Sequence, residues 1–135
     1  QDILDYEIQM DEEIYGYIIP KLTLQPLVEN ALYHGIKNKR GKGKILITGK
    51  KQGDKIIFQV IDNGKGMTEE ELNSLRKKMA GTDTGDEAKG FGVSNVNQRI
   101  KYYYGEEYGV FFESKENEGT NATIIIAAKN IQLPS

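Results

Sequence analysis

The sequence predicts an α+β two-layer sandwich, in which a mixed, mostly antiparallel sheet carries about three helices on one face. Two observations support this fold class. Short segments rich in β-branched residues are joined by tight glycine-containing turns, which is typical of antiparallel hairpins. Other segments have apolar residues at every third or fourth position, as on a helix that buries one face against a sheet.

The composition is that of one globular domain over residues 1–135. Hydrophobic residues make up 38% and charged residues 28%, which excludes a disordered chain. The net charge of −2, with both signs mixed along the chain, predicts no nucleic-acid partner. Without cysteine, disulfides and thiolate metal sites are excluded. No run approaches ~20 apolar residues, and the abrupt start at Gln1 suggests a piece of a longer protein.

Extended segments are predicted from period-two alternation and from β-branched residues. They cover residues 3–10, 14–19, 44–51, 55–62, 108–114 and 121–129. The segment 14–19 is interpreted as a short return after the first strand. Turns at 52–54 and 116–119, each containing a glycine, join the other four segments into two hairpins.

Helical periodicity predicts helices in three places. The first helix follows Thr23 as N-cap, has Pro26 in its first turn, where a missing N–H costs little, and ends near residues 35–37. The second begins after Thr68, and the three glutamates that follow suit the positive end of the helix dipole. The third covers about 93–104.

Polar side chains line one side of the first helix. Asn30, His34 and Lys37 follow at i, i+4 and i+7, with Tyr33 beside them. An amide oxygen can complete a Mg²⁺ shell made otherwise of water and phosphate oxygens, and His and Lys can contact phosphates. Taken alone, such a stripe is more often an ordinary solvated face.

A second group ends the strand at 55–62, where Asp62 is followed by Gly64, Gly66 and Met67. A carboxylate at this place can accept a hydrogen bond from an exocyclic amine such as adenine N6. Glycines let the backbone approach a flat ring closely. An ordinary turn rich in Asp and Gly explains the same residues equally well.

A third group is Gly90-Phe91-Gly92-Val93, which opens the third helix. Glycines at a helix N-terminus expose N–H groups that bind phosphate. No P-loop motif is present, because Gly41-Lys42-Gly43-Lys44 lacks both the spacing and the hydroxyl. The preceding residues 81–90 contain three glycines and almost no apolar side chain, which predicts a mobile loop.

In this order the three groups resemble the Bergerat (GHKL) ATP-binding fold, shared by gyrase B, MutL, the large heat-shock chaperone and histidine kinases. Residues 19–35, with the sequence IPKLTLQPLVENALYHG, are similar to the N-box of LytS/YesM-type sensor histidine kinases. Residues 62–67 resemble their G1 box, and residues 90–96 their G2 box. The resemblance covers essentially the whole chain.

The resemblance implies ATP and Mg²⁺ as cofactors. Asn30 would ligate Mg²⁺, and Asp62 would bind adenine N6, with Thr120 joining it through a water molecule. The full set of implied nucleotide-binding residues is Asn30, Tyr33, His34, Lys37, Asp62, Gly64, Gly66, Met67, Gly90, Phe91, Gly92, Val93 and Thr120. Tyr33 stands where many relatives carry a phosphate-contacting Lys, so the basic residue that takes over this contact is left open.

Two positions of the first helix bear on hydrolysis. ATPases of this fold activate water with a Glu one turn before the Mg²⁺-binding Asn, and here that position is Pro26, which abstracts no proton. Glu29 lies next to Asn30 and is a candidate acid–base or orienting group, with a structural salt bridge as the alternative. We therefore expect ATP to be held intact for transfer, which depends on positioning and charge neutralisation.

The chain contains one histidine, His34, and the resemblance puts it beside the nucleotide. The phosphoacceptor histidine is therefore expected on a separate dimerisation segment of the same kinase, with a response regulator as an indirect partner. Residues 1–135 are expected to be monomeric, to bind ATP without autophosphorylation, and to belong to the cytoplasmic part of a membrane-anchored sensor. The alternatives are a Bergerat-fold ATPase, an anti-sigma-factor-type serine kinase and a non-catalytic module that acts through protein contacts.

Overall fold

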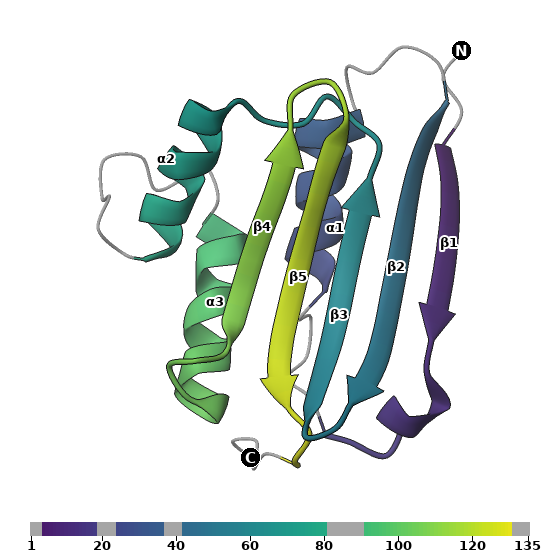
Figure 1. The fold of residues 1–135 in the computed structure, drawn as a ribbon, viewed down its shortest axis with the longest axis vertical. Helices are drawn as coiled ribbons and strands as arrows, with labels where there is room; N and C mark the ends of the chain where they lie inside the picture. Colours follow the sequence, from purple (N-terminus) through teal and green to yellow (C-terminus); the bar gives the residue numbers. More distant parts are fainter. Residues whose placement is uncertain (1–3, 19–23, 37–41, 81–90, 131–135) are drawn as a thin grey trace.

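A computed structural model describes residues 4–18, 24–36, 42–80 and 91–130. They form a five-stranded sheet with the order β1-β2-β3-β5-β4 (Figure 1). The strands are β1 (Leu4–Met10), β2 (Gly43–Gln52), β3 (Lys55–Asp62), β4 (Gly109–Lys115) and β5 (Gly119–Ala127). β1 pairs with β2 in parallel and all other pairs are antiparallel, so the sheet is mixed and mostly antiparallel, as predicted.

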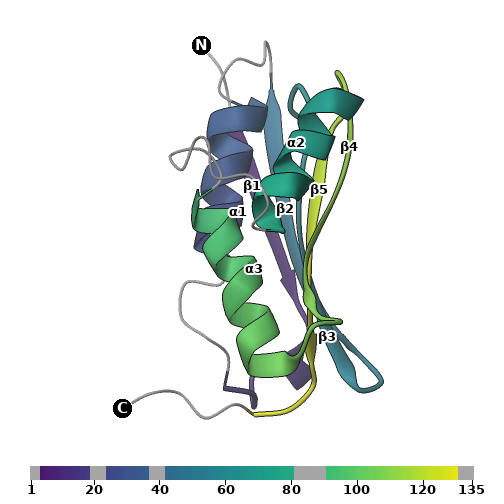
Figure 2. The same ribbon diagram turned by 90° about the vertical axis from the view of Figure 1, so that its left-hand side faces the viewer.

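The helices lie on one face of this sheet (Figure 2). They are α1 (Gln25–Asn30), α2 (Glu69–Met79) and α3 (Phe91–Tyr104). α1 continues as a π-helical segment, Ala31–Ile36. The predicted two-layer α+β sandwich is therefore confirmed. No helix in the described parts of the chain is long and apolar enough to span a membrane.

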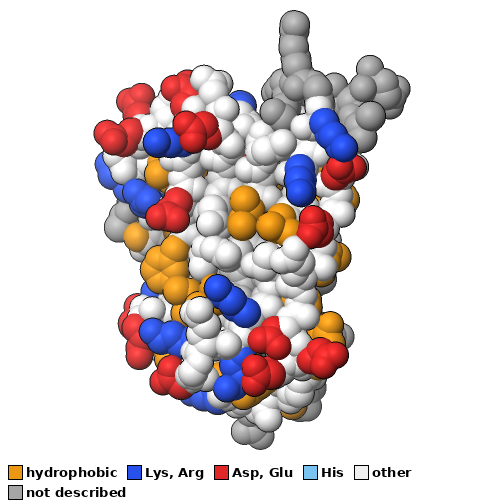
Figure 3. Space-filling view, turned by 45° about the vertical axis from the view of Figure 1, so that its right-hand side comes forward, with side chains coloured by type: hydrophobic (Ala, Val, Ile, Leu, Met, Phe, Trp, Pro, Cys, Tyr) orange, Lys and Arg blue, Asp and Glu red, His pale blue; other side chains and the backbone are white. Residues whose placement is uncertain are grey.

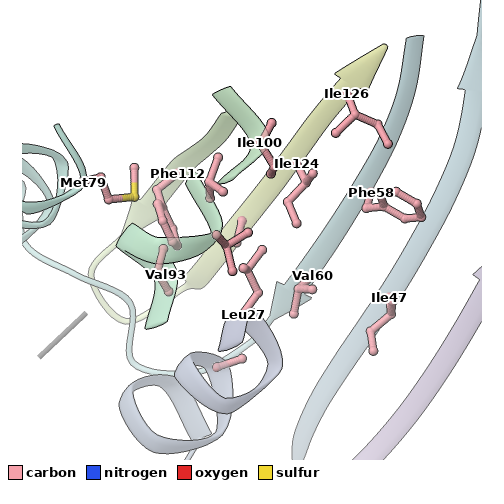
Figure 4. Packing of buried hydrophobic residues seen from close by; sticks show 14 of the residues in the cluster. Leu27, Ile47, Phe58, Val60, Met79, Val93, Ile100, Phe112, Ile124 and Ile126 are labelled. Carbon is pink, nitrogen blue, oxygen red and sulfur yellow. The ribbon is translucent and has the colours of Figure 1, made fainter. Parts of the chain in front are cut away.

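Alternation along the strands builds the core between the two layers (Figure 4). In β3, Ile56, Phe58 and Val60 point toward the helices and are at most 5% exposed. From the helices, Leu27 and Ile100 fill the space above them and are each 1% exposed. Burial of this apolar surface is the main force that holds the helices on the sheet.

The uncovered face of the sheet is chemically mixed. In the view of Figure 3, Lys and Arg side chains alternate with Asp and Glu around a few apolar groups. Ion pairs at the β1 edge follow the same pattern, with Lys42 2.9 Å from Asp5 and Lys44 3.6 Å from Glu7. A concentrated basic surface, which nucleic-acid binding needs, is not seen on this face.

The predicted extended segment at 14–19 is wrong over its described part. A short 3₁₀ helix, η1 (Glu12–Ile14), occupies its start, because the Asp11 side chain accepts a hydrogen bond from the Glu13 N–H and Ile14 turns into the core. The Tyr17 N–H then bonds to the Ile14 carbonyl in a turn. Residue 19 lies outside the described residues, as does Thr23, the predicted N-cap.

The first helix starts one residue later than predicted, because its N-cap position is Leu24, which makes no side-chain cap hydrogen bond, and Pro26 lies in its first turn. Its second half is π-helical, and this widening was not predicted. The i, i+4 spacing of Asn30 and His34 assumed α-helical geometry, so it no longer puts these two positions on one straight stripe. Lys37 lies outside the described residues, and so does the side chain of His34.

Other boundaries move by one or two residues. The predicted Thr68 cap is confirmed as a capping box, in which the Thr68 hydroxyl accepts from the Glu71 N–H and the Glu71 carboxylate accepts from the Thr68 N–H. α3 begins at Phe91 rather than at residue 93. β5 begins at Gly119 rather than at residue 121, because Lys115 pairs with Gly119 across a three-residue turn.

A buried amide joins α2, α3 and β4. Asn97 of α3 is 5% exposed. Its Nδ2 donates to the Met79 carbonyl at 3.3 Å, and its Oδ1 accepts from the Val110 N–H at 2.8 Å. Nearby, the Ser94 hydroxyl donates to the Lys78 carbonyl at 3.2 Å. The C-terminal carbonyls of α2 are thus bound by side chains of α3.

Asn97→Ala should lower the free energy of unfolding by about 1–3 kcal/mol, because it leaves a buried N–H and a buried carbonyl unpaired. Denaturant unfolding of the purified domain measures this change. The control is Asn95→Ala on the exposed side of the same helix, which should change stability by less than about 0.5 kcal/mol. Equal effects of the two substitutions would contradict the role given to Asn97.

Candidate functional site

Asp62 is a charged residue in a core position. Strand periodicity puts it on the helix-facing side after Val60, and it is only 6% exposed. Its Oδ1 accepts a hydrogen bond from the Gly64 N–H at 2.8 Å, and its carboxylate also accepts from the Thr120 N–H. Within the described residues no Lys or Arg lies within ion-pair distance of it. Among the described residues, backbone donors therefore compensate its burial.

Burial raises the pKa of the Asp62 carboxyl above its ordinary 3.8, and the N–H groups of Gly64 and Thr120 oppose this shift in part. A buried carboxylate has more lone pairs than the two N–H groups occupy. The remaining lone pairs are available to a neutral donor. The site is therefore suited to an amine or a water molecule rather than to a further anion.

The loop after Asp62 fits closely against the turn between β4 and β5. The Asn117 N–H donates to the Lys65 carbonyl at 2.6 Å. Gly66 has φ +69°, and a Cβ at this position would overlap the Lys115 carbonyl oxygen. A Cβ at Gly119 would likewise overlap the backbone of Asp62. Both glycines are therefore required by close backbone approach.

Ser114 is a site residue that the sequence did not reveal. It lies on β4 opposite Thr120, and its Oγ is 2.8 Å from the Thr120 Oγ1. The same Oγ accepts from the Met67 N–H at 2.8 Å. A serine within a strand forms no distinctive sequence motif. The one feature of the sequence that could have indicated Ser114 is its position opposite Thr120 in the hairpin.

α1 supplies the predicted metal ligand. Asn30 is half-buried, and within the described residues its side-chain amide makes no hydrogen bond. Glu29 is exposed and accepts a hydrogen bond from Gln25 Nε2 at 3.2 Å. Its acid–base role stays a prediction. The backbone of Tyr33 and His34 lies in the π-helical segment, and their side chains are outside the described part.

The N-terminus of α3 lies against the first turn of α1. A Cβ at Gly92 would be 3.3 Å from the Pro26 Cβ, so the absence of a side chain permits this approach. Val93 is 2% exposed and packs into the core, which leaves its backbone as the part able to contact a ligand. The predicted site residue Gly90 and the side chain of Phe91 lie outside the described residues.

The structure therefore brings the predicted residues into two groups on the helix-facing side of the sheet. Asp62, Gly64, Gly66, Met67 and Thr120 form one group at the end of β3. Asn30, Gly92 and Val93 form the other, where α1 meets α3. Among the described residues no cluster of three or more His, Cys, Asp or Glu side chains is placed to hold a metal.

Solved structures with this fold are catalytic domains of histidine kinases. The nucleotide-free catalytic domain of histidine kinase ThkA superposes with a TM-score of 0.63 at 20% identity, over 93% of this chain and 79% of that chain. A histidine kinase domain of the blue-light activated kinase EL346 from Erythrobacter litoralis superposes with a TM-score of 0.62 at 18% identity, over 91% of this chain and 51% of that chain. At such identities the likeness shows the fold alone.

Sequence comparison gives the family. The chain belongs to the family described as "Histidine kinase-, DNA gyrase B-, and HSP90-like ATPase" (HATPase_c), whose profile matches residues 20–130. The sensor histidine kinase YesM of Bacillus subtilis is 34% identical over 96% of this chain and 21% of its own length. The sensor protein LytS of Bacillus anthracis is 33% identical over 92% of this chain and 21% of its own length. The chain thus spans about a fifth of these two relatives.

Gly66→Ala should destabilise the domain more than Gly53→Ala. Both glycines have positive φ, +69° and +60°, but only Gly66 also faces a backbone carbonyl that a Cβ would overlap, since Gly53 has nothing within 4 Å. The Gly53 variant should lose about 1 kcal/mol from strain alone. Thermal unfolding of both variants measures the difference, and a Gly66 variant no less stable than the Gly53 variant would contradict the close fit of the loop.

Proposed function

We propose that this chain binds Mg·ATP and donates the γ-phosphate to a histidine on a separate dimerisation segment of the same kinase. The observation that supports this most directly is the buried Asp62 carboxylate, which backbone N–H groups hold in place without a cation among the described residues. A buried charge without a counter-ion is costly for stability, so its presence favours a functional role.

Asp62 is the group that recognises the base in this proposal. Its free lone pairs accept a hydrogen bond from the exocyclic amine of adenine, and a guanine carbonyl at the same place would be repelled. Gly64 and Gly66 bring the loop backbone close to the ring plane without intervening side chains. Thr120 supplies a hydroxyl beside the carboxylate.

The phosphates belong, in this proposal, where α1 meets α3. The first turn of α3 presents unpaired N–H groups and the positive end of the helix dipole to a phosphate. Asn30 would hold Mg²⁺ through its amide oxygen, and phosphate oxygens and water would supply the remaining ligands. The absence of a dedicated cluster of acidic or His ligands among the described residues agrees with such a shared shell. Mg²⁺ neutralises phosphate charge when bound.

Hydrolysis is not expected, because the residue one turn before Asn30 is Pro26, which lies half-buried in the first turn of α1. A proline has no group that abstracts a proton from water. Glu29 adjoins Asn30 and so does not lie at that position one turn earlier, and its side chain accepts a hydrogen bond from Gln25 on the helix surface. We therefore propose a kinase domain of a sensor protein, and the same proposal includes a cytoplasmic location and a response regulator as an indirect partner.

Wild-type domain should bind Mg·ATP in calorimetry, and Asp62→Asn should weaken binding at least tenfold. The amide presents an NH₂ group in place of one carboxylate oxygen, so it loses acceptor capacity and charge where the adenine amine binds. Binding of equal strength in the two proteins would refute the assignment of Asp62 to the base.

The stability of the same variant controls for misfolding. The pKa of Asp62 is raised in the folded protein, so folding disfavours the ionised carboxylate. The contribution of Asp62 to the free energy of unfolding therefore falls as the pH rises from about 3.8 through the raised pKa. Asp62→Asn should remove this dependence and be at least as stable as wild type at pH 7. A lower stability at pH 7 would show that the carboxylate serves the fold.

The isolated domain should release no phosphate from Mg·ATP above the rate of a no-protein control. Phosphate release, measured on the domain at saturating Mg·ATP, checks the role given to Pro26. Multiple turnovers would instead favour an ATPase of the same fold.

A further inference from the structure

We propose that Ser114 is a positioning residue for the base-binding group, and that it sets the affinity for the adenine base without contacting the phosphates. Its hydroxyl joins the loop after Asp62 to Thr120, the two parts of the chain that flank the base in the proposed site. The proposal rests on the proposed function, since it concerns the same adenine pocket.

Ser114 makes three contacts at hydrogen-bond distance. Its Oγ lies 2.8 Å from the Met67 N, 3.0 Å from the Gly119 carbonyl oxygen and 2.8 Å from the Thr120 Oγ1. It is half-buried on β4, directly opposite Thr120 in the register of the hairpin. One side chain of an edge strand thus contacts both the loop after Asp62 and the first two residues of the neighbouring strand β5.

The valence of a hydroxyl makes these contacts interdependent. Ser114 has one proton and two lone pairs, and the Met67 N–H occupies one lone pair. The proton goes either to the Gly119 carbonyl or to the Thr120 hydroxyl, and the second lone pair can accept the Thr120 proton only in the first case. In the first case the Thr120 hydroxyl can donate to Ser114, and in the second it accepts from Ser114, so both cases hold the Thr120 oxygen beside Asp62.

Ser114 also fixes the end of the loop whose start is held by Asp62. The Asp62 carboxylate accepts from the Gly64 N–H, two residues after the strand. The Met67 N–H, three residues further, is held by Ser114. Because the intervening Gly66 has positive φ and fits tightly against Lys115, a shift of either end would move the backbone that faces the base.

The phosphate-binding group is built from other parts of the chain. Ser114 contacts residues of the loop and of β5, whereas the phosphate group consists of α1 and the first turn of α3. Removing the Ser114 hydroxyl should therefore weaken contacts to the base and leave contacts to a base-free phosphate chain intact. This separation distinguishes a positioning role from a general loss of structure.

Ser114→Thr and Ser114→Val form a matched pair that differs in one hydroxyl against one methyl group. The Thr variant should bind Mg·ATP within about twofold of wild type, and the Val variant roughly tenfold more weakly, since it leaves the Met67 N–H without its partner and frees Thr120. Tripolyphosphate with Mg²⁺ should bind wild type and both variants equally in calorimetry. The ratio of the affinity for ATP to the affinity for GTP should decrease in the Val variant and stay unchanged in the Thr variant.

Thr123→Val serves as the control and should leave every affinity unchanged. It removes a hydroxyl from β5 of the same hairpin, but three residues after Thr120, on the opposite face of the sheet, where that hydroxyl bonds to Asn121. If Ser114→Val proves unfolded at the temperature used, Ser114→Ala, which adds no volume, takes its place with the same expectation. Equal ATP affinity of the Val and Thr variants would overturn the proposal, as would a parallel loss of ATP and tripolyphosphate. Wild type that binds tripolyphosphate but neither ATP nor GTP would refute the proposed function itself.

Discussion

The burial of the Asp62 carboxylate is the constraint that the surrounding backbone has to satisfy. A charge in a core position of β3 needs hydrogen-bond donors, and here the backbone supplies them. To do so the chain after the strand must fold back at once, which brings Gly64 to the carboxylate. β5 must also pair in a register that places Thr120 opposite Asp62. The close backbone approaches at Gly66 and Gly119 follow from this packing.

Most of the fold was predictable because it is locally encoded. Alternation along β2 and β3, the glycine turns and the Thr68 capping box each depend on residues near one another in the sequence. The failures have tertiary or competing local causes. Residues after Asp11 turn rather than extend because that side chain caps η1 and Ile14 joins the core. The π-helical widening after Asn30 has no signal in the apolar spacing, and we have no physical account of it.

The candidate site likewise contains residues that the sequence predicts and residues that only the packed structure reveals. Asp62 and Gly66 were predicted because glycines after a strand-ending acid form a recognisable motif, and the structure gives each a physical reason. The motif does not include the surface against which this loop packs. That surface consists of the β4–β5 turn, which Lys65 contacts, and the end of β4, which Met67 contacts, and it comes about fifty residues later in the chain. Ser114 belongs to that surface, so only the packed structure shows its contacts.

The contacts of Asn97 and Ser94 have a consequence for changes in chain length. They tie the last carbonyls of α2 to side chains of α3, so these two helices hold each other through contacts between described residues. The entropic cost of closing a loop grows slowly with its length, by about 0.6 kcal/mol for each doubling. A longer or shorter connection between α2 and α3 is therefore expected to cost little stability, because the bonds that Asn97 and Ser94 make do not depend on its length.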